Sequence, residues 1–137
     1  NDFRKKASVY LYGNEKIVEL KAKLMKNCDV LGWYYQIYGV EPNYSGNKYE
    51  KMMKECEKIA EEIKELDASD EIIKAELINA AEGCALLAKW CAALVGYKVK
   101  SKIKFEIWIN EYVRLWNKSN KRGELDEVLK MFRKSNE

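Results

Sequence analysis

Two pairs of adjacent carboxylates are the side chains best suited to acid–base chemistry in this sequence of 137 residues. Asp70 is followed by Glu71, and Asp126 by Glu127. Two carboxylates can hydrolyse a bond when they converge on it. Both pairs are expected in the first turn of a helix, where the helix dipole stabilises negative charge. Because neighbouring helical residues diverge by about 100°, neither pair converges, and no catalytic residue is assigned.

The sequence contains no histidine. This excludes Ser–His–Asp and Cys–His nucleophile pairs, histidine-ligated zinc, and an imidazole base that titrates near neutral pH. The glycine-rich loops GxGxxG and GxxxxGKS/T, which bind phosphates, do not occur either. We therefore expect no cofactor, and a carboxylate-based enzyme is the least favoured of the function classes that the sequence leaves open.

Four cysteines occupy apolar positions in helical patterns: Cys28, Cys56, Cys84 and Cys91. Cys84 and Cys91 share a helix face but lie about 10 Å apart along the axis. A disulfide requires Cα atoms within about 7 Å, so these two cannot bridge. Since no CxxC pair occurs, we interpret the four thiols as small core side chains and expect no metal site.

The C-terminal part of the chain is basic and rich in aromatic residues. Residues 98–134 contain eleven Lys and Arg against five acids, with Trp108, Tyr112 and Trp116 among them. Basic and aromatic side chains together are typical of single-strand nucleic-acid binding. However, these rings belong to the face expected in the core, and the net charge of the whole chain is only +3. Both observations argue against nucleic acid as a partner.

Helical periodicity extends through most of the chain, which has one proline and seven glycines. Apolar residues at steps of three and four predict helices over residues 15–31, 48–66, 70–95 and about 101–117, and a last short helix that carries Leu125, Val128, Leu129 and Phe132 inward. The alanine-rich helix over residues 70–95 is expected at the centre, with Ser69 as its N-cap and Gly96 as its stop. Over residues 97–105, lysines alternate with mostly apolar residues, a period of two that also suits an edge strand.

These elements predict a single all-α domain over residues 1–137, an antiparallel bundle-like array of five or six helices. A composition of 47% hydrophobic and 34% charged residues fits a chain with a core of its own. No uncharged apolar run approaches the roughly 20 residues of a membrane span, and the N-terminus lacks the apolar core of a signal peptide. No membrane partner is therefore expected.

Residues 32–47 form an aromatic stretch that contains three glycines, the single proline and five aromatic residues. Such rings can stack on sugars or bases. The favoured alternative is that Trp33, Tyr35 and Tyr38 fill gaps between helices and leave their polar atoms in water. Ligand binding by this stretch is left open.

Residues 112–132, YVRLWNKSNKRGELDEVLKMF, carry a resemblance to a known family. This segment resembles the end of the C-terminal helical domain that follows the catalytic barrel in family 20 β-N-acetylhexosaminidases. The matching residues are Arg114, Leu115, Trp116, Asn120 and Lys121. The alanine-rich residues 76–94 and the segment 7–17 are similar to other parts of that domain, although Asn14 and Glu15 stand where the family often has Asp-Pro.

The resemblance implies a non-catalytic accessory domain of an exo-glycosidase, because the family's active site lies on the barrel. No catalytic residue is transferred to this chain. We expect an interdomain docking surface formed by Tyr12, Trp33, Tyr35, Arg114, Trp116 and Asn120. The expected partner is the catalytic barrel of the same polypeptide, and a homodimer is a further candidate. The alternative is a free-standing helical domain that binds protein or, through residues 98–122, nucleic acid. The sequence does not decide between a cytoplasmic and a cell-surface or secreted location.

Overall fold

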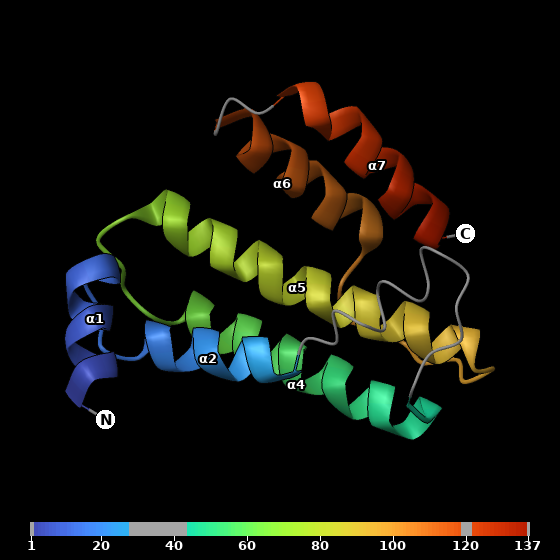
Figure 1. Ribbon diagram of the computed structural model, residues 1–137, viewed down its shortest axis with the longest axis horizontal. Coiled ribbons are helices and arrows are strands. Elements are labelled where there is room, and N and C mark those ends of the chain that lie inside the picture. Colours follow the sequence, from blue (N-terminus) through green and yellow to red (C-terminus); the bar gives the residue numbers. More distant parts are fainter. Residues whose placement is uncertain (1, 28–43, 119–121, 137) are drawn as a thin grey trace.

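The computed structural model describes residues 2–27, 44–118 and 122–136 (Figure 1). The described residues form helices and no strands, which confirms the all-α prediction. The helices are α1 (Asp2–Tyr12), α2 (Ile17–Asn27), α4 (Gly46–Lys64), α5 (Glu71–Leu94), α6 (Phe105–Lys118) and α7 (Arg122–Asn136).

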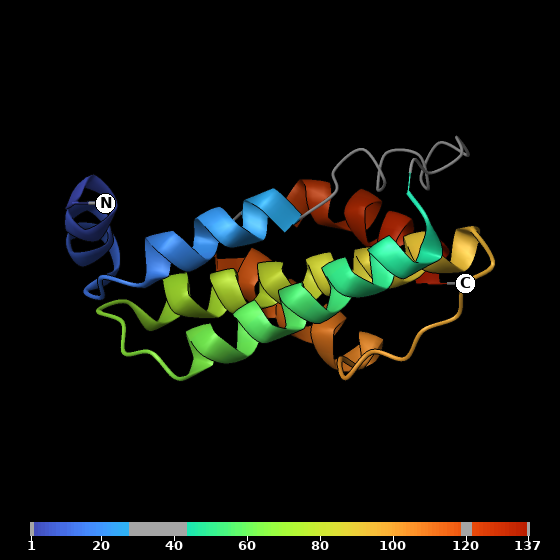
Figure 2. The same ribbon diagram turned by 90° about the horizontal axis from the view of Figure 1, so that it is seen from below.

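The helices pack as an antiparallel bundle around α5. α4 and α5 run antiparallel and form the most extensive helix pair. α2 lies along α4, whereas α6 and α7 lie on the opposite side of α5 (Figures 1 and 2). α1 projects crosswise at the end of the bundle where α4 leads into α5. The prediction of a central alanine-rich helix is therefore confirmed.

Two clusters of buried side chains meet on α5. The first joins α2 and α4 to one side of α5, and includes Ile17, Leu24, Cys56, Ile63 and Ala81. The second joins the rest of α5 to α6 and α7 and is mainly aromatic, with Trp90, Trp108 and Phe132 at its centre. Since α5 supplies residues to both clusters, it must be apolar over a wide arc.

One helix boundary was predicted on the wrong residue. Asp70, not Ser69, caps α5, because its side chain accepts hydrogen bonds from the backbone N–H groups of Ile72 and Ile73. The N–H of Ser69 instead donates to the carbonyl of Tyr12 at 2.8 Å. Gly96 follows the end of α5 with φ of 77°, as its role as a helix stop predicts.

The connection between α5 and α6 is longer than predicted, since α6 begins only at Phe105. We call residues 97–104 the strap. Val99 and Ile103 pack against the core, whereas the alternate lysines Lys98, Lys100, Lys102 and Lys104 are all exposed. The strap has the predicted period of two, but the structure shows it as an irregular segment and not as an edge strand.

Two further helices differ from the prediction. α1 was not predicted at all. α7 has 15 residues and begins at Arg122, so that Asp126 lies in its second turn rather than its first. Within α7, Phe132 is buried and Val128 and Leu129 are half-buried, as predicted, whereas the side chain of Leu125 lies outside the described part of the structure.

Among the described residues, one helix, α5, has the length and apolar composition of a membrane span. Half of its most apolar window is buried inside the protein. The same length and composition are what a central core helix requires, and α5 occupies that position here.

Candidate docking surface

A pair of reciprocal hydrogen bonds fixes α6 against α5. The indole Nε1 of Trp108 donates to the backbone carbonyl of Asn79 at 2.8 Å, and the Asn79 side-chain amide donates to the carbonyl of Trp108 at 3.3 Å. Both residues are buried, so these bonds satisfy polar groups that would otherwise be costly to desolvate. Gly83 leaves room for the ring, since a Cβ there would lie 2.9 Å from Trp108 Cζ2.

From Trp108, a ladder of aromatic rings runs along α6 toward its C-terminal end. The ring centroids of Trp108 and Tyr112 are 5.5 Å apart, and those of Tyr112 and Trp116 are also 5.5 Å apart. Phe132 of α7 meets Trp108 and Tyr112 edge-on at 5.0 and 5.1 Å. Separations of this size are favourable for aromatic pairs. The ladder therefore couples α6 to α7.

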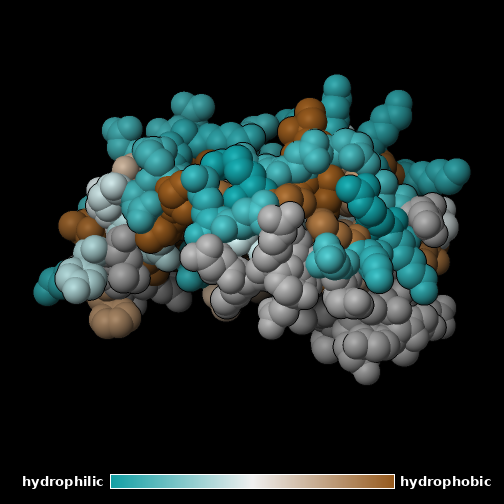
Figure 3. Space-filling view, turned by 90° about the horizontal axis from the view of Figure 1, so that it is seen from above, coloured by the Kyte–Doolittle hydropathy of each residue, from teal (hydrophilic) through white to brown (hydrophobic). Residues whose placement is uncertain are grey.

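The ladder reaches the surface at Tyr112 and Trp116, which are half-buried. Arg114 is exposed and forms an ion pair with Glu111 on the same helix. Partial burial penalises the charged phenolate and raises the pKa of Tyr112 to about 12. On the face seen from the side of α6 and α7, hydrophobic side chains reach the surface in separate groups among hydrophilic ones (Figure 3). We refer to Tyr112 and Trp116 as the α6 patch; Arg114, two residues from each, points to another face of the helix.

The structure does not bring Tyr12 into this patch. Tyr12 is only 7% exposed and packs in the cluster of α2, α4 and α5, so it presents no surface to a partner. α1 and α6 lie on opposite sides of α5 (Figure 1). Its expected place on a docking surface shared with Arg114 and Trp116 is therefore not what the structure shows. Trp33, Tyr35 and Asn120 lie outside the described residues.

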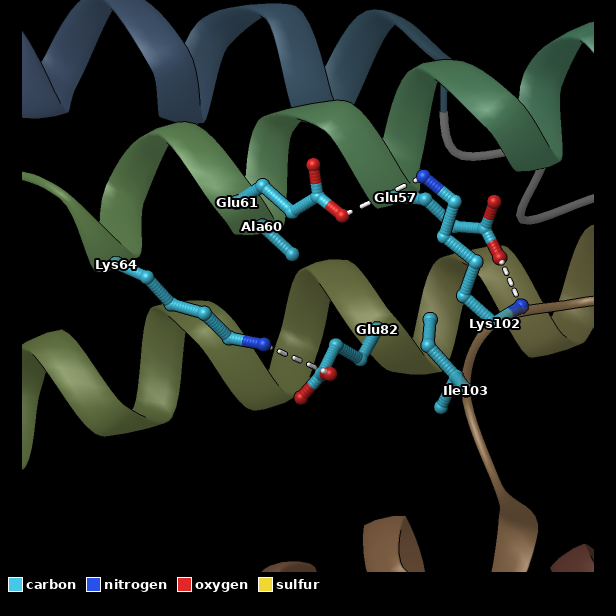
Figure 4. A pocket seen from close by; sticks show the side chains of 7 residues that line it. All are labelled: Glu57, Ala60, Glu61, Lys64, Glu82, Lys102 and Ile103. Carbon is cyan, nitrogen blue, oxygen red and sulfur yellow. Dashed lines mark hydrogen bonds and ion pairs between the residues drawn. The ribbon is translucent and has the colours of Figure 1, made fainter.

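A charged groove of about 210 Å³ lies between α4, α5 and the strap (Figure 4). Glu61 pairs with Lys102 at 3.6 Å, and Glu82 pairs with Lys64 at 3.4 Å. The remaining acid, Glu57, is buried and accepts hydrogen bonds from Ser101 Oγ at 2.7 Å and from the Lys102 N–H at 2.8 Å. The carboxylates of the groove thus bind the strap and neighbouring lysines, and this arrangement stabilises the fold.

The paired carboxylates that the sequence offered for acid–base chemistry do not form a site. Asp70 caps α5, and Asp126 is exposed on α7. In the described ranges, no group of three or more Cys, Asp or Glu side chains is placed to hold a metal ion. Cys56 and Cys91 are buried thiols and Cys84 is a half-buried thiol, which agrees with their predicted use as core residues.

Sequence reasoning missed two kinds of residue. Glu57 and Asn79 act through contacts with segments 45 and 29 residues away, which no local pattern signals. Phe3 and Tyr10 are large and exposed on α1, at 79% and 88%. Their seven-residue spacing was a usable signal, because it places both on one face of a helix.

Comparisons with protein-family models, with curated proteins and with solved structures found no match to this chain.

Proposed function

We propose that this chain is a non-catalytic helical accessory domain that packs against a neighbouring catalytic domain through the α6 patch. The observation that carries the proposal is the composition and support of that patch. Trp, Tyr and Arg are the residue types most enriched at the energetic centres of protein interfaces. Here Tyr112 and Trp116 stack on one face of α6, near its C-terminal end, and both are half-buried.

The rings behind the patch support this role. Tyr112 contacts Trp108 and Phe132, and Trp108 is held to Asn79 by two hydrogen bonds. A surface whose side chains are already ordered loses less conformational entropy when a partner binds. The ladder therefore favours the patch as a preorganised contact site.

The proposed parent enzyme is an exo-glycosidase similar to family 20 β-N-acetylhexosaminidases, with a catalytic barrel in the same polypeptide. This part of the proposal depends on the resemblance of residues 112–132 and 76–94 alone. The resemblance includes Trp116, which also belongs to the α6 patch, and this supports the barrel as the proposed partner.

The proposal can be tested with Trp116→Ala in the complete polypeptide. This change should lower the midpoint temperature of the catalytic domain's unfolding, because an aromatic contact of the interface is lost. Asn110→Ala, an exposed change on another face of α6, is the matched control and should leave that midpoint unchanged.

Two results would reject the proposal. One is a complete coding sequence with no catalytic domain beside residues 1–137. The other is saccharide hydrolysis by residues 1–137 alone, which would make this chain an enzyme in its own right.

One observation favours the alternative of a free-standing interaction domain. The four lysines of the strap are all exposed at alternate positions, which forms a basic row. One of them, Lys102, is paired with Glu61, so the row is partly neutralised. Steeply salt-dependent binding of polyanionic nucleic acid would favour this alternative over the accessory domain.

A further inference from the structure

The strap keeps the two-residue period of a strand although it belongs to no sheet among the described residues. Its odd-numbered residues face inward: Val99 and Ile103 pack against the core, and the Ser101 hydroxyl donates to Glu57 at 2.7 Å. Its even-numbered residues are the four lysines, and all of them are exposed. The strap therefore presents a row of positive charges at intervals of about 6–7 Å, the rise of two extended residues.

Contacts with α4 hold the strap in this conformation. The Tyr97 hydroxyl donates to Glu50 at 3.2 Å, and the Lys102 N–H donates to Glu57 at 2.8 Å. Glu50 and Glu57 are about 10 Å apart along the helix axis, which agrees with an extended course of the strap between these two contacts. The lysine row is thus ordered before a partner binds, and this lowers the entropy lost on binding.

The backbone of the strap offers hydrogen bonds to a partner. Among the described residues, none accepts a hydrogen bond from the N–H groups of residues 98–100. An extended segment with unpaired backbone groups is a template for pairing with another chain. Peptides that bind by strand addition use such an edge, and the side chains beside it determine which peptide is accepted.

The lysines determine the charge of the peptide that fits. Lys98, Lys100 and Lys104 form no ion pair with the described residues, and Lys102 pairs with Glu61 at 3.6 Å between two exposed side chains. Such an exposed pair is weak, so a partner's carboxylate can replace Glu61. Opposite charges stabilise neighbouring strands, whereas like charges destabilise them. The strap of a second copy is therefore disfavoured, and an acidic strand is favoured.

We propose that the strap binds an extended, acidic segment of a partner protein by strand addition. The backbone of that segment pairs with residues 98–100, and acidic side chains at its alternate positions lie beside the lysine row. Glu57 acts indirectly, because it holds the strap in place. This inference goes beyond the accessory function and is independent of it, since it uses the strap and not the α6 patch.

Titration of the full chain with a blocked peptide of alternating glutamate and threonine, followed by amide NMR, tests the proposal. We expect saturable binding that weakens with added salt and slows hydrogen exchange at residues 98–100. Lys100→Glu should raise the dissociation constant at least about tenfold, because it places like charges together. Lys21→Glu makes the same charge change on α2, on the other side of α4 from the strap (Figure 2). This matched control should change the dissociation constant less than about twofold.

Altered peptides separate the effect of charge from that of backbone pairing. A peptide with glutamine in place of every glutamate should bind at least about tenfold more weakly, because the opposite-charge pairs are lost. In an added strand, alternate N–H groups point toward the neighbouring strand. N-methylation of one alternate set of peptide nitrogens should therefore abolish binding, while methylation of the other set should have little effect.

Four results would overturn the proposal. They are no saturable binding of the acidic peptide, equal binding of the glutamine peptide, equal effects of the two N-methylated sets, and equal losses in Lys21→Glu and Lys100→Glu. Tighter binding of duplex DNA than of the acidic peptide, lost in Lys100→Glu, would assign the lysine row to a phosphate backbone and would likewise overturn it.

Discussion

Glu57 shows how a single buried carboxylate determines the course of a connecting segment. It is 7% exposed and accepts hydrogen bonds from the Ser101 hydroxyl and the Lys102 N–H. Burying a carboxylate is costly unless its oxygens are bonded, and burying a backbone N–H without an acceptor is costly too. The strap and Glu57 therefore stabilise one another.

Glu57→Ala should lower the free energy of unfolding by about 1–3 kcal/mol, because two donors of the strap lose their acceptor. Urea denaturation followed by circular dichroism measures this. The control is Glu61→Ala, which removes an exposed carboxylate paired with Lys102 and should cost no more than about 0.5 kcal/mol. Equal losses in the two variants would show that Glu57 does not hold the strap.

Tyr112 should make the fold sensitive to alkaline pH. Its pKa rises from 10.0 to about 12 on folding, because partial burial disfavours the phenolate. The folded protein thus retains a proton that the unfolded chain releases, so this contribution is complete below about pH 10 and is lost as the pH rises toward about 12. Tyr112→Phe should reduce the fall in stability between these pH values, as measured by urea unfolding at stepwise increasing pH. An unchanged pH profile would contradict this account of Tyr112.

At the scale of the elements, the contact between α5 and α6 depends on the absence of a side chain at Gly83. In an exposed helix interior, Gly→Ala is stabilising by about 0.5–1 kcal/mol. At Gly83 the new Cβ would lie 2.9 Å from Trp108 Cζ2. We expect Gly83→Ala to destabilise the protein by about 1–3 kcal/mol instead, as overpacking does.

A double-mutant cycle with Trp108→Phe checks this explanation, because the smaller ring removes the atom in conflict. In the Trp108→Phe background, Gly83→Ala should become neutral or stabilising in thermal unfolding. The same destabilisation in both backgrounds would show that Trp108 is not the cause.

The elements that could be predicted from sequence are those whose apolar residues face the core. α4 and α5 have clear three- and four-residue spacing, and their bounds agree with the prediction to within about two residues. α1 was missed because Phe3, Val9 and Tyr10 face outward and do not form a core-facing stripe. Ser and Asp both suit the N-cap position, so the local sequence does not decide between Ser69 and Asp70. In the structure, the N–H of Ser69 donates instead to the carbonyl of the distant Tyr12.

The candidate site was predictable only in part. Arg114 and Trp116 were selected through a family resemblance, and burial of Trp108 was expected from its helix face. The support behind them, formed by Asn79, Gly83 and Phe132, depends on contacts between helices that local spacing does not encode. Tyr12 was misplaced because an aromatic residue beside a helix end suits a docking surface and a core equally well.

At the scale of the whole molecule, α6 and α1 lie in different parts of the bundle. The α6 patch belongs to the α6–α7 side of α5, and α1 lies at the end of the bundle where α4 leads into α5 (Figure 1). A change in the α6 patch should therefore leave the packing of α1 intact.

The central claim is that another domain covers the α6 patch. Hydroxyl-radical footprinting of the complete polypeptide and of residues 1–137 alone tests it most directly, with the buried Trp90 and Trp108 as internal references. We predict that Trp116 is oxidised in the isolated chain and protected in the complete polypeptide, while labelling of the two reference residues stays the same. Equal oxidation of Trp116 in both would contradict the claim.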